Sequence, residues 1–137
     1  MSAGAVIADA RREDVPLILR FIRELADYER LSHEVVATEG ALAATLFGPK
    51  PGAEVLIAHL DGAPAGFALF FPNYSTFLAK PGIYLEDVYV TPGLRGRGVG
   101  LALLAAVARR AVERGCGRLE WSVLDWNETA LGFYRKL

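Results

Sequence analysis

The chain has 137 residues, of which 53% are hydrophobic, and its mean hydropathy of +0.26 suits one domain with a single core. The formal net charge of -1 gives no indication of nucleic acid or of an anionic membrane as a partner. The single cysteine, Cys116, excludes an internal disulfide and fits a reducing cytoplasm, and neither a signal peptide nor an apolar run of bilayer length is present.

Capping residues, prolines and glycines set the limits of the predicted elements in the first half of the chain. Pro16, two residues after Asp14 of the acidic pair Glu13-Asp14, marks the start of a helix with an apolar stripe. Thr38 can cap a second helix, and Asp61-Gly62 is typical of a hairpin turn. The predicted elements are a strand over residues 3–8, a helix from about 13 to 28, a polar connection over 28–34, a helix from 38 to 47, and strands over 54–60 and 65–71.

A strand, a glycine-rich turn and a helix form the centre of the second half. The strand, residues 83–90, is β-branched and aromatic apart from two acids, and helical periodicity begins at Leu101. Gly115-Cys116-Gly117 ends that helix; a strand over 119–124 and a helix over 128–137 follow. The order β-α-α-β-β-β-α-β-α predicts a single α/β (α+β) domain over residues 1–137, with a mixed, mostly antiparallel sheet and one right-handed βαβ crossover.

The turn Arg95-Gly96-Arg97-Gly98-Val99-Gly100 has the features of a diphosphate cradle. Its glycines let successive N–H groups face one concavity at a helix N-terminus, where negative charge is favoured. The two arginines add donors suited to phosphate oxygens. The alternative is a flexible turn with solvated arginines. The dinucleotide fingerprint needs a glycine where Leu101 stands, and the P-loop needs a Lys-Ser/Thr pair that is absent, so neither of these phosphate loops fits.

These residues resemble a known family. Arg95-x-x-Gly98-x-Gly100 after an acidic strand matches the coenzyme-A-binding motif of the GNAT superfamily of N-acetyltransferases. The wider segments YLEDVYV, LRGRGVG and SVLDWNETALGFYRKL are similar to the diamine (spermidine/spermine) acetyltransferase branch. The resemblance implies the GNAT fold, in which two parallel strands splay apart around the pantetheine arm, and acetyl-CoA as the acetyl donor.

The function implied is acetyl transfer to a primary amine of a small molecule, such as a polyamine, a diamine or a lysine-like amino acid. Direct attack in a ternary complex is expected, because no Ser or Cys nucleophile motif is present. Two alternatives stay open, a non-catalytic acyl-CoA-binding module and a protein N-acetyltransferase. Retention of Glu86 and Tyr134 favours the enzyme over the binding module.

The chemistry requires a base, a donor for the thioester oxygen and an acid for the leaving thiolate. Glu86 is the preferred base and Asp87 the alternative; in a regular strand they face opposite sides, and a β-bulge would change which one enters a given cleft. A solvated or ion-paired acidic pair is the alternative reading. Tyr134 is the candidate acid, although the same position would suit a core aromatic residue. The residues expected to bind the coenzyme are Val88, Tyr89, Val90, Arg95, Gly96, Arg97, Gly98, Val99, Gly100, Leu101, Asn127 and Tyr134.

The acceptor side is predicted from polar residues in two connections, which together with Glu86 and Asp87 could wall an amine pocket: Tyr28, Glu29, His33, Glu34 and Tyr74. Each of these five residues could equally be merely solvated or packed. No Cys or His stands at metal-ligand spacing from either histidine, so no metal site is expected. The partners expected are a small amine and a second copy of the chain, with no nucleic acid and no membrane. A homodimer is expected because the family's sheet continues with further strands past the last helix, whereas this chain stops at Leu137.

Overall fold

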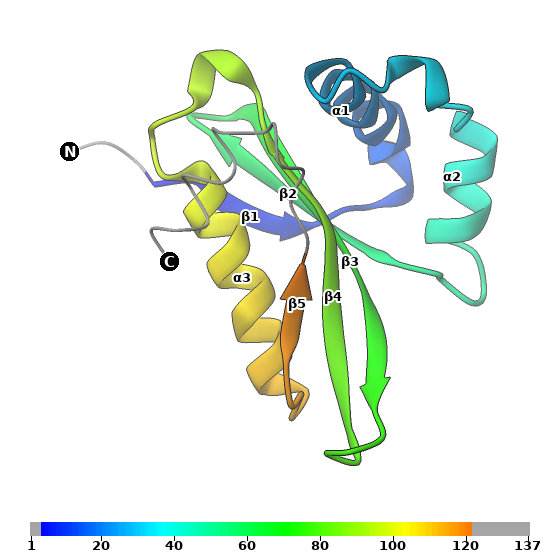
Figure 1. Ribbon diagram of the computed structural model, residues 1–137. Coiled ribbons are helices and arrows are strands. Elements are labelled where there is room, and N and C mark those ends of the chain that lie inside the picture. Colours follow the sequence, from blue (N-terminus) through cyan, green and yellow to red (C-terminus); the bar gives the residue numbers. More distant parts are fainter. Residues whose placement is uncertain (1–3, 122–137) are drawn as a thin grey trace.

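Five strands form one sheet in the computed structural model, which describes residues 4–121 (Figure 1). The strands lie side by side in chain order: β1 (Val6–Asp9), β2 (Glu54–Leu60), β3 (Ala63–Ser75), β4 (Lys80–Val90) and β5 (Leu119–Trp121). Neighbours from β1 to β4 are antiparallel, and β5 pairs with β4 in parallel. The mixed, mostly antiparallel sheet with a crossover into its last strand is therefore confirmed.

Helices cover both faces of the sheet. Figure 1 shows α1 (Val15–Tyr28) and α2 (Glu39–Leu46) on one side and α3 (Val99–Glu113) on the other. We call these the α1 face and the α3 face. Short 3-10 turns precede or connect the helices: η1 (Arg12–Asp14), η2 (Ser32–Glu34) and η3 (Pro92–Leu94). No helix in residues 4–121 is long and apolar enough to cross a bilayer.

The sheet divides the core into two layers. On the α1 face, Ile18 and Phe21 pack against Phe67 and Tyr89, and the rings of Phe21 and Phe67 stack with centroids 5.5 Å apart. On the α3 face, Leu103 and Val107 pack against residues that include Phe70, Ile83 and Leu85. Each layer buries one face of the sheet against a helix, which fixes both helices relative to β4.

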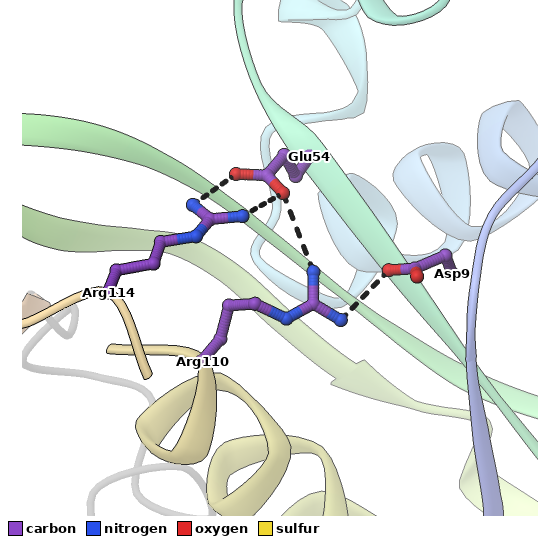
Figure 2. A network of polar contacts seen from close by, with 4 residues as sticks. All are labelled: Asp9, Glu54, Arg110 and Arg114. Carbon is purple, nitrogen blue, oxygen red and sulfur yellow. Dashed lines mark hydrogen bonds and ion pairs between the residues drawn. The ribbon is translucent and has the colours of Figure 1, made fainter. Parts of the chain in front are cut away.

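Ion pairs attach the C-terminal end of α3 to β1 and β2 (Figure 2). Arg114 donates to both carboxylate oxygens of Glu54 at 2.6 Å. Arg110 lies between Glu54 and Asp9, with nitrogen–oxygen distances of 3.5 and 3.0 Å. The network joins α3 to β1 and β2, two strands that lie far from its position in the sequence.

The β3–β4 hairpin is longer than predicted. β3 continues to Ser75 and β4 begins at Lys80, whereas the sequence placed the ends of these strands at 71 and 83. The sequence predicts a loop between residues 71 and 83 because this segment contains Pro72 and Pro81. The N–H of Ile83, opposite Pro72, points to the β5 side, toward Arg118, so Pro72 occupies a pair without ladder hydrogen bonds. Pro72 has no N–H to donate, and its nitrogen faces away from β4. On that side β2 extends only to Glu54, opposite Phe70, so no ladder hydrogen bond is lost.

The other limits differ by smaller amounts. β1 occupies residues 6–9 rather than 3–8, and α3 starts at Val99, two residues before the predicted start, because Gly98 serves as its N-cap. Thr38 caps α2 as predicted, accepting a hydrogen bond from the N–H of Ala41 at 3.1 Å. Asp61 and Gly62 both have positive φ, as a tight hairpin turn of this kind requires. The predicted residues 122–124 of the last strand and the helix over 128–137 lie outside the described part of the chain.

Candidate active site

A β-bulge in β4 sets the direction of the acidic side chains. Asp87 pairs with Leu69 and Leu85 pairs with Phe70, so Glu86 is an extra residue without a partner on β3. In a regular strand, Leu85 and Tyr89 would share a face. Instead, Leu85 packs on the α3 face and Tyr89 on the α1 face. The bulge therefore turns Asp87, which lies two residues before Tyr89 and so shares its face, toward the α1 face.

Three carboxyl groups lie within electrostatic range of one another there. Burial raises the pKa of Asp87 to about 7, and the negative charges of Glu86 and Glu29 add to the effect in that order. The pKa of Glu29 is also raised, first by burial and then by the charge of Glu86. We call Glu29, Glu86 and Asp87 the acidic cluster. A group of this kind attracts a cationic amine and holds one carboxyl whose ionisation changes near neutral pH.

The end of α1 carries Glu29 into the cluster. Arg30 adopts a left-handed conformation with φ of 64°, and its N–H bonds the carbonyl of Asp27 at 3.1 Å. The N–H of Leu31 reaches the carbonyl of Ala26 at 2.7 Å. This pair of bonds is the Schellman motif, which usually has glycine at the left-handed position. The closed turn fixes where the helix ends and hence where Glu29 stands.

The outer edge of β4 offers backbone groups beside the cluster. The N–H of Thr91 bonds Ala65 on β3, so by alternation the N–H and C=O groups of Val88 and Val90 point away from β3. Within residues 4–121, β5 pairs with β4 only as far as Leu85, opposite Trp121. The edge from Val88 to Val90 thus has no strand beside it in the described part of the chain, as the predicted pantetheine site requires.

Beyond β4, the glycine-rich turn presents N–H groups at the start of α3. Gly96 and Gly98 have φ of 79° and 82°, so both use the left-handed region that favours glycine. The first bond of α3 runs from the N–H of Ala102 to the carbonyl of Gly98 at 3.0 Å. The N–H groups of residues 99–101 have no acceptor one turn earlier, and those of 96–98 bond no backbone acceptor in residues 4–121. This is the donor set that a diphosphate needs.

The two arginines of the turn take different positions. Arg95 turns back toward the sheet: its Nε donates to the carbonyl of Val90 at 2.8 Å, and its guanidinium lies over the rings of Tyr28 and Tyr89. Arg97 is half-exposed and forms an ion pair with Asp61 at 3.5 Å. Phosphate contact by Arg97 would need only this exposed pair to open, whereas Arg95 is engaged in packing.

Comparison with known proteins decides the family. A sequence profile of the Acetyltransferase (GNAT) family matches residues 20–137. The chain belongs to the GNAT acetyltransferase family. Thialysine N-epsilon-acetyltransferase of Bos taurus is 41% identical over 98% of this chain and 84% of its own length. L-ornithine N5-acetyltransferase NATA1 of Arabidopsis thaliana is 37% identical over 90% of this chain and 74% of its own length.

Solved structures agree on the fold. An integron cassette protein from the mobile metagenome of V. cholerae matches with a TM-score of 0.78 and 27% identity, covering 98% of this chain and 84% of that chain. An aminoglycoside acetyltransferase from a soil metagenomic sample matches with a TM-score of 0.82 at 20% identity, over 96% and 86% of the two chains, and shows the fold alone. The predicted GNAT resemblance and fold are confirmed, and the chain is an acetyltransferase of this family.

Not every residue predicted for the GNAT site lies at it. Tyr89 is 5% exposed in the core, its hydroxyl donates to Glu24 at 2.9 Å, and its N–H points to β3, so its side chain and N–H are both engaged within the protein. The Val99 side chain is buried in the α3 layer, so only its backbone is available to a ligand, whereas Leu101 in the first turn of α3 is 51% exposed. Asn127 and Tyr134 lie outside the described residues.

The acceptor residues also separate. Tyr28 and Glu29 adjoin the site, whereas His33 and Glu34 are exposed in η2 and do not contribute to the raised pKa of Asp87. Tyr74 is five residues along β3 from Leu69, which faces Asp87, and so about 17 Å away along the strand. The structure thus leaves Tyr74 near the far end of the hairpin. Among residues 4–121, no three His, Cys, Asp or Glu side chains are placed to hold a metal ion.

Sequence reasoning missed two partners of the site residues. Glu24 binds the Tyr89 hydroxyl from α1, and Asp61 pairs with Arg97 from the β2–β3 turn. Both contacts join segments far apart in the chain, and neither residue stands in a motif. Glu24 lies four residues before Tyr28 in α1, so the two side chains share a face of the helix. This spacing is the one sequence feature that indicates an approach of Glu24 to the site.

Proposed function

We propose that this GNAT chain transfers the acetyl group of acetyl-CoA to a primary amine of a small molecule that carries a further positive charge, such as a polyamine, a diamine or a lysine-like amino acid. The observation that supports it most strongly is the β-bulge at Glu86, which turns Asp87 toward Glu29 next to the open edge of β4. The relatives named for thialysine and ornithine act on amines of this class.

The residues present fit acetyl-CoA. The N–H groups of residues 96–101 would hold its diphosphate at the start of α3, and the backbone of Val88 and Val90 would pair with the pantetheine arm as an added strand does. Because Arg95 already occupies the carbonyl of Val90 at 2.8 Å, Val88 is left as the less encumbered of the two. Acetyl-CoA supplies an activated acetyl thioester, and the protein has to orient it, accept a proton and stabilise charge.

The acidic cluster addresses the proton of the amine. An alkylammonium has a pKa of about 10, so the acceptor must lose a proton before it can attack. Asp87, with a pKa of about 7, is a better matched base at neutral pH than a carboxylate with an ordinary pKa, and it can accept the proton directly or through water. Glu86, which is exposed on the bulge, and Glu29 would attract and orient the cationic substrate. The preference between Glu86 and Asp87 as the base thus shifts to Asp87.

Two further roles complete the mechanism. The N–H of Val88 would donate a hydrogen bond to the thioester oxygen as negative charge develops on it. Tyr134 would return a proton to the departing thiolate, since phenol and thiol pKa values differ by only about one or two units. Direct attack by the amine then needs no acyl-enzyme.

We also propose a homodimer in the cytoplasm. β5 has one neighbour in the described sheet, and a second copy could cover its outer edge. The free thiol of Cys116 is compatible with a reducing compartment. Size-exclusion chromatography with light scattering tests the assembly, and a clean monomer at micromolar concentration would contradict it.

A panel of amines assayed with acetyl-CoA, with released thiol as the readout, tests the activity. We expect turnover of ornithine, thialysine or a polyamine and little turnover of a neutral amine of similar length. Asp87→Asn should lower kcat for the best amine by at least about tenfold, a loss within the range of general-base catalysis. Failure to acetylate any primary amine, despite tight binding of coenzyme A, would support an acyl-CoA-binding module instead. Acetylation of a peptide amine in preference to every small amine would favour a protein acetyltransferase.

A further inference from the structure

The geometry points to Arg95 as a positioning residue: its guanidinium joins the coenzyme turn to the end of α1, so that the coenzyme side and the amine side of the site are held in one arrangement. This inference rests on the proposed function. It gives Arg95 a role other than the phosphate contact that its place in the motif predicts.

The first contact fixes Arg95 to the strand. Its Nε donates to the carbonyl of Val90 at 2.8 Å, on the outer edge of β4. The bond spans five residues and closes the segment between β4 and the glycine-rich turn. The guanidinium plane is thereby kept at the root of the turn, away from the N–H groups that follow Gly96.

Two aromatic rings then receive the guanidinium. Its Cζ lies 4.6 Å from the ring centroid of Tyr28 and 5.5 Å from that of Tyr89, both within the range of a cation–π contact. Tyr89 is held in the core, packed against Phe21 with ring centroids 6.2 Å apart and bonded through its hydroxyl to Glu24. One ring is therefore a fixed support, and the other connects Arg95 to α1.

Tyr28 brings the contact to the amine side. It is the last residue of α1, and Glu29 of the acidic cluster follows it directly as the C-cap. A change in the Arg95 guanidinium would remove one contact of the Tyr28 ring, and the Glu29 side chain would then shift relative to Asp87, although the closed turn keeps its backbone in place. Arg95 therefore contacts neither substrate in this account, but it controls how closely the third carboxyl approaches the other two.

The decisive variant is Arg95→Lys, which keeps the positive charge but loses the planar guanidinium and its Nε–H. We expect the KM for the best amine of the panel to rise by about 5- to 20-fold, while the Kd for coenzyme A, measured by calorimetry, changes by less than about threefold. Tyr28→Leu should reproduce the rise in KM, and the double variant should be no worse than the worse single variant, because both remove the same contact. Tyr28→Phe, which keeps the ring, should restore most of the affinity lost in Tyr28→Leu.

A matched control is Arg12→Lys. Arg12 also donates from its guanidinium to a backbone carbonyl, that of Phe47 at 2.8 Å, but it lies at η1 and away from β4. Both constants should stay within about twofold of those of the unmodified protein. Thermal unfolding of all variants checks that they are folded before they are compared.

A second readout needs no turnover. In an NMR titration of the Asp87 carboxyl, Arg95→Lys and Tyr28→Leu should lower its pKa, because the charge of Glu29 would no longer be held nearby; Arg12→Lys should not. An unchanged pKa of Asp87 in both variants, or an Arg95→Lys that weakens coenzyme A more than the amine, would overturn the inference. If the unmodified protein acetylates no amine, the proposed function fails, and the titration still decides the link between Arg95 and Glu29.

Discussion

At the scale of single residues, Asp87 is the group most changed by its surroundings. It lies in β4 between Glu86 and Val88, and the bulge turns it toward the α1 face, where the charges of Glu86 and Glu29 act on it. Burial and like charge both disfavour its ionised form, so a proton is held up to about pH 7. A base of this strength costs stability, because the folded chain must carry a buried negative charge above that pH.

The stability of Asp87→Asn should therefore depend on pH. The folded pKa of about 7 exceeds the ordinary value of 3.8, so the folded state of the unmodified protein binds the proton more tightly and loses stability as the pH rises from about 4 to 7. We expect Asp87→Asn to be more stable at pH 8 by about 1–3 kcal/mol, allowing for the part of the carboxylate that water reaches, and nearly unchanged at pH 4. Urea unfolding at the two pH values measures the difference. A gain that is equal at both values would contradict the raised pKa.

Removing either neighbouring charge should move the acid limb of the pH–rate profile. Glu86→Gln and Glu29→Gln each take away a negative charge that raises the pKa of Asp87, so the limb should move to lower pH, further for Glu86→Gln, whose charge has the larger effect. Profiles of kcat/KM against pH measure the two shifts. Glu39→Gln, an equal change of charge at the start of α2, serves as the control and should leave the limb in place. A limb that moves to higher pH would exclude Asp87 as the titrating base.

At the scale of elements, the glycine-rich turn depends on a left-handed residue at the start of α3. A Cβ on Gly98 would meet no atom within 4 Å, so the cost of a side chain there is backbone strain alone. Gly98→Ala should lower stability by about 1–2 kcal/mol and weaken coenzyme A binding, because relaxing φ would redirect the N–H groups of the turn.

Gly93→Ala is the matched control for this change. Gly93 lies in η3 of the same connection, also has open space around its Cβ, and has no positive φ. Its substitution should alter the free energy of unfolding by no more than about 0.5 kcal/mol. Denaturant unfolding and calorimetry with coenzyme A compare the pair, and equal losses in both variants would argue against a specific role for the left-handed turn.

The sequence was sufficient for the elements that have strong local signals. The periodicity of α1, the Thr38 cap, the Asp61-Gly62 turn and the start of the βαβ crossover all depend on residues near one another in the chain. The predicted ends of β3 and β4 are wrong because Pro72 and Pro81, considered from the sequence alone, indicate a break in each strand. Which side a proline's nitrogen faces depends on pairing with another strand, and local sequence carries no record of it.

The site was predictable in the same partial way. The motif locates the turn, and the sequence places the acidic pair in the strand before it. The direction of Glu86 and Asp87 depends on a bulge opposite Leu69, which local sequence does not indicate. Arg95 was interpreted as a phosphate ligand because motif spacing contains no information on side-chain direction. Its contacts with Tyr28 and Tyr89 arise only when α1 is packed on the sheet.

At the scale of the whole molecule, the network around Glu54 holds the C-terminal end of α3, the helix that begins at the coenzyme turn, against β1 and β2. Glu54 is about one-third exposed and binds two arginines, one of them through both oxygens. Glu54→Gln should lower stability by about 1–2 kcal/mol, more than an ordinary surface pair contributes, because the bidentate geometry is lost. The difference should shrink in 1 M salt.

Glu13→Gln provides the comparison. Glu13 pairs with Arg11 at 3.8 Å, and both side chains are more than two-thirds exposed, so its loss should barely change stability. Thermal unfolding in low and high salt measures both variants. If Glu54→Gln lowers thermal stability no more than Glu13→Gln does, the network of Figure 2 does not contribute to the stability of the fold.

The extra residue in β4 also defines what the chain can tolerate in evolution. Glu86 has no partner on β3, so deleting it would make Leu85 and Asp87 consecutive opposite Phe70 and Leu69. Tyr89 would then stay in the layer under α1, and Val88 would stay in the layer under α3. Descendants of this protein could therefore lose the residue at position 86 without exchanging the two faces of the strand. The loss would remove only the local irregularity of the strand and the exposed carboxylate next to Asp87.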